Sequence, residues 1–112
     1  MTDWVEIGDA ESVPRLGSRI VRTGAGDIAV FRTEADDYFA LDDRCPHRGG
    51  PLSQGIVHGR RVTCPLHNLV VELATGRAVA PDEGCARAHR VRLDAGRLWL
   101  ALGEAGGASA AA

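Results

Sequence analysis

Residues 45–67 read CPHRGGPLSQGIVHGRRVTCPLH, and this stretch holds two short segments of the same chemistry. The first segment supplies Cys45 and His47, and the second supplies Cys64 and His67. A thiolate and an imidazole in each segment indicate a zinc site or an iron–sulfur centre, because both accept this mixture of ligands. Prolines and paired glycines exclude regular structure here, so we expect two loops.

The ligand spacing favours a cluster over zinc. Structural zinc sites pair Cys with Cys and His with His, or use two-cysteine knuckles, whereas each loop here mixes both ligand types. This division lets Cys45 and Cys64 bind one iron while His47 and His67 bind the other, which is the arrangement of a Rieske [2Fe–2S] centre. A structural zinc ion held by the same four residues is the alternative.

The sequence on either side of the loops indicates β-structure. Apolar residues alternate or run in short blocks that are separated by Gly, Pro, Asp and Thr. The acidic run 34–37 is expected to be a hairpin loop, and Pro14 limits any helix near residues 11–16. We expect strands at residues 4–7, 19–22, 28–32, 38–41, 56–58, 61–63, 69–73, 90–93 and 97–100. The pattern predicts an all-β fold, a small antiparallel β-sandwich or barrel interrupted by two cluster-binding loops.

Length and charge narrow the class of protein. A chain of 112 residues is expected to form one domain, here residues 1–103, followed by a disordered Ala/Gly-rich tail at 104–112. A net charge of −2, without any basic run, argues against nucleic acid or an anionic membrane as the partner. The chain shows neither an apolar stretch of about 20 residues nor a secretory signal, so we expect a cytoplasmic protein.

The two loop segments resemble the paired cluster-binding boxes of Rieske proteins. The resemblance is close over residues 45–67, and the β-rich remainder is compatible with a whole Rieske-type domain. It implies one [2Fe–2S] cluster per chain, bound by Cys45, His47, Cys64 and His67. It also implies that the chain transfers electrons for an oxidoreductase and has no catalytic residues of its own.

The resemblance separates this chain from the Rieske proteins of respiratory and photosynthetic complexes. Those proteins link the two loops by a disulfide, whose cysteines would fall at Gly50 and Leu66 here. They also place Ser and Tyr hydrogen-bond donors at the positions of Leu69 and Val71. Because fewer donors destabilise the reduced cluster, we expect a potential near the low end of the Rieske range, roughly −150 mV.

Among the remaining Rieske proteins, the flanking sequence is most similar to the small subunit of assimilatory NAD(P)H-dependent nitrite reductase. The similarity lies in residues 50–57, 62–68 and 82–85, and Asn68 stands where dioxygenase ferredoxins usually have glycine. Leu69 departs from the family, in which an aromatic residue is common at this position. The resemblance implies a large partner subunit that carries FAD, a [4Fe–4S] cluster and sirohaem and reduces nitrite to ammonium in nitrate assimilation.

Two alternatives stay open. The first is a soluble Rieske ferredoxin that feeds a ring-hydroxylating dioxygenase, and the second is a subunit whose cluster serves docking without carrying electrons. Outside the loops, we expect His58 and His89 on the surface and Cys85 as a buried thiol without a redox role.

Overall fold

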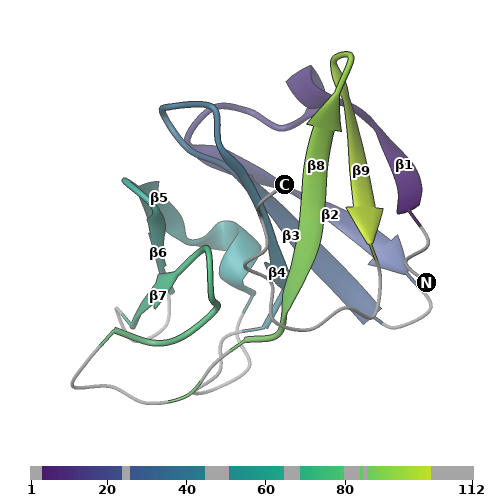
Figure 1. Ribbon diagram of the computed structural model, residues 1–112. Coiled ribbons are helices and arrows are strands. Elements are labelled where there is room, and N and C mark those ends of the chain that lie inside the picture. The colour runs from purple at the N-terminus through teal and green to yellow at the C-terminus, as the bar shows by residue number, and fades with distance from the viewer. Residues whose placement is uncertain are drawn as a thin grey trace.

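The computed structural model describes residues 4–23, 26–44, 51–64, 69–79, 84 and 86–101, and within them the chain is almost entirely β-structure (Figure 1). The elements are β1 (Trp4–Asp9), η1 (Ala10–Ser12), β2 (Gly17–Thr23), β3 (Gly26–Arg32), β4 (Tyr38–Asp42), η2 (Leu52–Gln54), β5 (Ile56–His58), β6 (Arg61–Thr63), β7 (Val70–Glu72), β8 (Ala88–Asp94) and β9 (Arg97–Ala101), where η denotes a short 3₁₀ helix. Every strand expected from the sequence is present, which confirms the all-β prediction. The expected tail at 104–112 lies outside the described residues.

Two antiparallel sheets make up the fold. The larger sheet has the strand order β1-β9-β8-β4-β3-β2, and the smaller one has the order β5-β6-β7. Figure 1 shows the larger sheet curving into a half-barrel, with the smaller sheet to one side of it. The β4–β8 ladder is short, since its register covers only Ala40 with His89 and Leu41 with Ala88.

Strand β3 divides the core into two layers because successive side chains of a strand point to opposite faces. Ala29 and Phe31 belong to one buried cluster, whereas Ile28 and Val30 belong to the other. The first cluster, called here the loop core, contains Ala29, Phe31, Leu41, Leu52, Val57, Val62, Cys64, Leu69, Val71, Leu73, Ala86 and Ala88. The second, called the barrel core, contains Ala10, Val13, Ile28, Val30, Ala40, Leu98 and Leu100.

The two terminal strands of the larger sheet are connected by an arginine. The register of β1 with β9 shifts between Glu6 and Gly8, so a β-bulge leaves Ile7 out of the ladder. Arg19 of β2 donates from Nη1 to the Ile7 carbonyl oxygen at 2.6 Å and to Ser12 Oγ at 3.1 Å. The guanidinium therefore satisfies a carbonyl that the bulge would otherwise leave unpaired.

A charged network surrounds the β3–β4 loop, the hairpin loop predicted at residues 34–37. Arg15 donates to both carboxylate oxygens of Asp36 at 3.1 Å, and Arg32 Nε donates to Asp36 Oδ1 at 2.9 Å. Hydrogen bonds from these two guanidinium groups lower the pKa of Asp36. Next along the chain, the Tyr38 hydroxyl donates to the Ala10 carbonyl oxygen at 3.3 Å, and burial raises the pKa of that hydroxyl.

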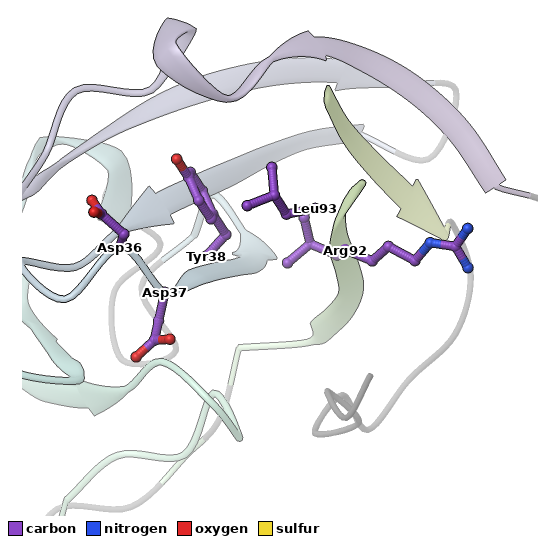
Figure 2. Close-up of a pocket in the computed structure, with 6 residues that line it drawn as sticks. Asp36, Asp37, Tyr38, Arg92 and Leu93 are labelled. Carbon is purple, nitrogen blue, oxygen red and sulfur yellow. The ribbon is translucent and has the colours of Figure 1, made fainter. Parts of the chain in front are cut away.

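Figure 2 shows a surface hollow of about 340 Å³ beside this network, between the start of β4 and the end of β8. Its lining consists of Asp36, Asp37, Tyr38, Val91, Arg92 and Leu93. The carboxylate of Asp36 and the hydroxyl of Tyr38 are already hydrogen-bonded within the protein. The hollow lies at the Tyr38 end of β4. The first predicted loop departs from the other end of this strand, at Asp42.

Candidate metal centre

The first predicted loop leaves β4 after Asp42 and returns at η2, and its two ends are tied together. The carboxylate of Asp43 accepts hydrogen bonds from the Ser53 backbone N–H at 2.7 Å and from Ser53 Oγ at 3.0 Å. Ser53 is held in turn by Ser18 of β2, whose hydroxyl donates to the Ser53 carbonyl oxygen at 2.7 Å. Neighbouring Leu52 is fully buried, so both polar bonds and apolar burial fix the returning end.

The second predicted loop joins β6 to β7. Thr63 pairs with Val70 as the last step of the antiparallel ladder. Beyond that pair, the Cys64 N–H donates to the Leu69 carbonyl oxygen at 2.7 Å. This bond joins the two residues on either side of positions 65–68, so Cys64 lies where the second predicted loop begins.

The ends of the two loops lie in the same apolar cluster. Leu52 from the first loop and Cys64 and Leu69 from the second are all buried in the loop core. Gly55 allows this close approach, because a Cβ atom there would collide with the Thr63 carbonyl oxygen and with Cγ2 of Val62. A residue without a side chain is therefore required where the first loop passes β6.

The structure places one of the four predicted ligands. Cys64 is fully buried at the end of β6, whereas Cys45, His47 and His67 lie outside the described residues. No group of three or more His, Cys, Asp or Glu side chains that could hold a metal occurs in the part of the chain that is described. The prediction that all four residues are ligands is therefore left untested.

The donor set fits an iron–sulfur cluster. Two thiolates and two imidazoles, divided between two loops, are the ligands of a Rieske centre. The placement of Cys64 is consistent with this chemistry, because its thiol lies in an apolar cluster that keeps water away from a cluster bond. A β-scaffold with two tied loops and this donor set defines a metal-binding domain of the iron–sulfur class.

The family model of the Rieske [2Fe-2S] domain matches residues 3–91. The chain belongs to the Rieske [2Fe-2S] domain family, as the paired loop segments indicated. The family implies a [2Fe–2S] cluster, which confirms the predicted cofactor and disfavours the zinc alternative. The domain is an electron-transfer module of oxidoreductase systems.

Similar proteins of known function include oxygenases and their electron carriers. The chain is 38% identical over 111 residues to 4beta-methylsterol monooxygenase from Methylococcus capsulatus, a match that covers 89% of this chain but 29% of the monooxygenase. It is 30% identical over 104 residues to the anthranilate 1,2-dioxygenase ferredoxin subunit from Burkholderia cepacia, covering 92% of this chain and 95% of that subunit. The second match spans nearly the whole of both proteins.

The fold is also shared with a solved structure described as a putative NADH-dependent nitrite reductase small subunit from Mycobacterium tuberculosis. The two structures superpose with a TM-score of 0.81 over 90% of this chain and 96% of the other, at 20% sequence identity. Identity at this level shows the common fold alone. None of the helices in the described residues has the length and apolar character needed to cross a bilayer.

The two histidines outside the loops differ in environment. His58 is exposed, as predicted, and its Nε2 lies 2.6 Å from Thr63 Oγ1. The prediction of a surface position for His89 is wrong, because only 4% of this residue is exposed and its Nε2 lies 2.7 Å from Asp42 Oδ1. Cys85, the predicted buried thiol, lies outside the described residues.

A signal for the burial of His89 was present in the sequence. Residues two apart on a strand share a face, and His89 is followed at this spacing by Val91. In the structure Val91 packs against the barrel core, and His89 pairs with Ala40, which belongs to the same core. The alternation therefore pointed His89 inward, although histidine is more often exposed.

Proposed function

We propose that this chain is a Rieske ferredoxin that delivers electrons to the oxygenase of a hydroxylating system. The observation that carries the proposal is the match to the anthranilate 1,2-dioxygenase ferredoxin subunit, which is 30% identical and covers nearly all of both chains. This function was the first alternative to nitrite reductase in the sequence analysis. The partners would be a reductase that supplies electrons and an oxygenase that consumes them.

In this role Cys45 and Cys64 would bind one iron of the cluster, and His47 and His67 would bind the other. The bound cluster supplies reversible storage of a single electron. The work of the protein is to hold the loops and to exclude water from them. The bonds between Asp43 and Ser53 support the holding function at one loop, and the burial of Cys64 supports the exclusion of water at the other.

A second candidate function is electron transfer or docking as the small subunit of an NAD(P)H-dependent nitrite reductase. Two observations favour it, namely the sequence of residues 50–57 with Asn68 and the fold shared with the Mycobacterium tuberculosis protein at a TM-score of 0.81. The partner would then be a large subunit with FAD, a [4Fe–4S] cluster and sirohaem. We rank this candidate second, because its supporting structure has 20% identity whereas the ferredoxin subunit has 30%.

The test offers the purified protein, with its cluster loaded, to both kinds of partner. In one arm, a reductase and a ring-hydroxylating oxygenase are supplied with NADH, and product is measured with and without the protein. In the other arm, a sirohaem–flavin nitrite reductase large subunit is supplied with NAD(P)H, and nitrite consumption is measured.

Stimulation of hydroxylation alone supports the ferredoxin, whereas stimulation of nitrite consumption alone overturns it in favour of the second candidate. The control is Cys64→Ser, which should abolish stimulation by loss of the cluster. If this variant lacks the cluster and still stimulates nitrite consumption as well as the loaded protein does, the subunit contributes docking and its cluster does not carry the electrons.

A further inference from the structure

Of the two histidines in the described residues, His89 is buried and His58 is exposed. Its side chain is 1% exposed, and it lies on β8 opposite Ala40 of β4. A histidine buried to this extent needs hydrogen-bonding partners, because an unpaired polar atom loses its contact with water. One partner is evident, since Nε2 lies 2.7 Å from Asp42 Oδ1.

The contacts of the two ring nitrogens indicate which one donates a hydrogen bond to Asp42. Nδ1 is buried and has no hydrogen-bond partner among the described residues. An ionised carboxylate only accepts hydrogen bonds, so Nε2 carries a proton and donates it to Asp42. The Asp42 carboxylate is thus held by a buried N–H donor.

Asp42 lies where the first predicted loop begins. It is the last residue of β4 and stands three residues before Cys45. Three residues of extended chain span at most about 11 Å, so the Cα atoms of Asp42 and Cys45 lie within that distance. The Asp42 side chain is 35% exposed, so water screens part of its charge, and the remainder opposes the addition of an electron to a centre bound by the first loop.

The pair also strengthens the strand connection from which the loop departs. The β4–β8 ladder has two register pairs, and the backbone N–H of Asp42 continues it by donating to the Arg87 carbonyl oxygen at 2.8 Å. Arg87 Nε lies 3.8 Å from Asp42 Oδ2, so the second carboxylate oxygen has a cation near it. The bond to His89 is therefore the short, buried contact that fixes this carboxylate.

The same strand connection borders the core that encloses Cys64. Leu41 precedes Asp42 and Ala88 precedes His89, and both pack in the loop core with Cys64. A shift of β4 against β8 would move these two residues as well. The pair is consequently linked to the first predicted loop by the backbone and to Cys64 by packing of its neighbours in the loop core.

We propose that His89 and Asp42 form a positioning pair for the [2Fe–2S] cluster. His89 fixes the end of β4 from which the first loop departs, and the Asp42 carboxylate it holds lowers the reduction potential by opposing the added electron. This inference rests on the proposed ligand set through Cys45 and on the family assignment of the cluster. It does not depend on which enzyme receives the electron.

The test uses three variants of the full chain, each loaded with its cluster. Asp42→Asn keeps the shape and the acceptor oxygen but removes the charge, and the midpoint potential should rise. His89→Phe keeps a buried ring but removes the donor, and release of iron into a chelator should become about tenfold faster. His89→Gln returns an N–H donor and should restore part of the slow release.

Asp36→Asn serves as the matched control, since it removes a paired carboxylate in the loop that precedes the opposite end of the same strand. It should leave the midpoint potential, the g-values of the reduced cluster and the iron-release rate as in the unmodified protein. If His89→Phe does not fold, Asp42→Asn and His89→Gln carry the test.

The inference fails if Asp42→Asn and His89→Phe lower the melting temperature yet match the control in potential, g-values and iron release. That result would make the pair a structural contact only. Cys45→Ser separates this failure from failure of the ligand set. Retention of the Rieske spectrum in that variant would overturn the ligand assignment, and with it the basis of the pair's role.

Discussion

The two ends of β4 hold their carboxylates in opposite ways. At the Tyr38 end, Asp36 is half-exposed and shared between Arg15 and Arg32. At the other end, Asp42 bonds to the buried ring of His89 at 2.7 Å and has Arg87 Nε at 3.8 Å. Cationic partners at one end neutralise the charge and stabilise the hairpin. At the other end the short contact is to a buried imidazole and the guanidinium of Arg87 lies further away, and this is the end next to the predicted cluster.

The largest expected effect of a substitution is at the cluster end. Cys64→Ser should remove a ligand of the [2Fe–2S] cluster, so iron content and the visible spectrum of the purified protein should be lost. Loss of the cluster should also lower the melting temperature, because a group that binds only the folded state stabilises it. Cys85→Ser is the matched variant outside the loop pattern and should keep its iron. Full iron content in Cys64→Ser would refute its role as a ligand.

The second prediction concerns the close packing at the same end. Gly55→Ala places a Cβ atom against the Thr63 carbonyl oxygen, and we expect a loss of about 3 kcal/mol in the free energy of unfolding. Gly59→Ala meets open space but holds a φ of 58°, so about 1 kcal/mol is expected there. Chemical denaturation of both variants measures the difference. Equal losses of unfolding free energy in the two variants would mean that the close contact between residue 55 and β6 is not the reason why glycine is required there.

The third prediction concerns the other end and depends on pH. Arg15 and Arg32 hold the pKa of Asp36 below its usual value, so the native state binds fewer protons than the unfolded state in acid. The stability contributed by this carboxylate is present at neutral pH and is lost as the pH falls through the native pKa. Asp36→Asn should therefore melt below the unmodified protein at pH 7, and the gap should narrow towards pH 3. A gap that stays constant with pH would argue against the ion pairs.

The smallest expected effect is that of Tyr38→Phe. The variant removes one hydrogen bond, from the Tyr38 hydroxyl to the Ala10 carbonyl oxygen at 3.3 Å, and should cost at most about 1 kcal/mol. Chemical denaturation measures this cost, and a redox titration should find the same midpoint potential as in the unmodified protein. A shifted potential would show that the two ends of β4 are coupled, which would blur the distinction between them.

Local pattern was enough to predict the strands. The prediction for β5 and β6 agrees with the structure residue for residue, because two short segments rich in β-branched residues flank a turn that contains Gly59. Strand β8 begins two residues before the predicted start, at Ala88. The extra length is set by pairing with β4, which a local pattern does not contain.

The candidate site also combines features set by short sequence motifs with features set by contacts between residues far apart in the sequence. The cluster boxes are compact motifs, and the family match confirms the cofactor that they predicted. The local alternation pointed His89 inward, but its burial was missed because the hydrogen-bond partner that stabilises it, Asp42, lies 47 residues away in the sequence. A buried polar residue is stable only with such a partner, so its placement depends on the fold.

The contact that Arg19 of β2 makes with β1 affects how two molecules of this protein can associate. These strands end the six-stranded sheet, and an end strand is a template on which a strand of another molecule can assemble. Arg19 occupies the Ile7 carbonyl oxygen and fills the bulge with a charged group. Strand-to-strand association at this position would have to displace a guanidinium from its acceptor. A bond within the fold thereby also helps to keep concentrated protein from aggregating.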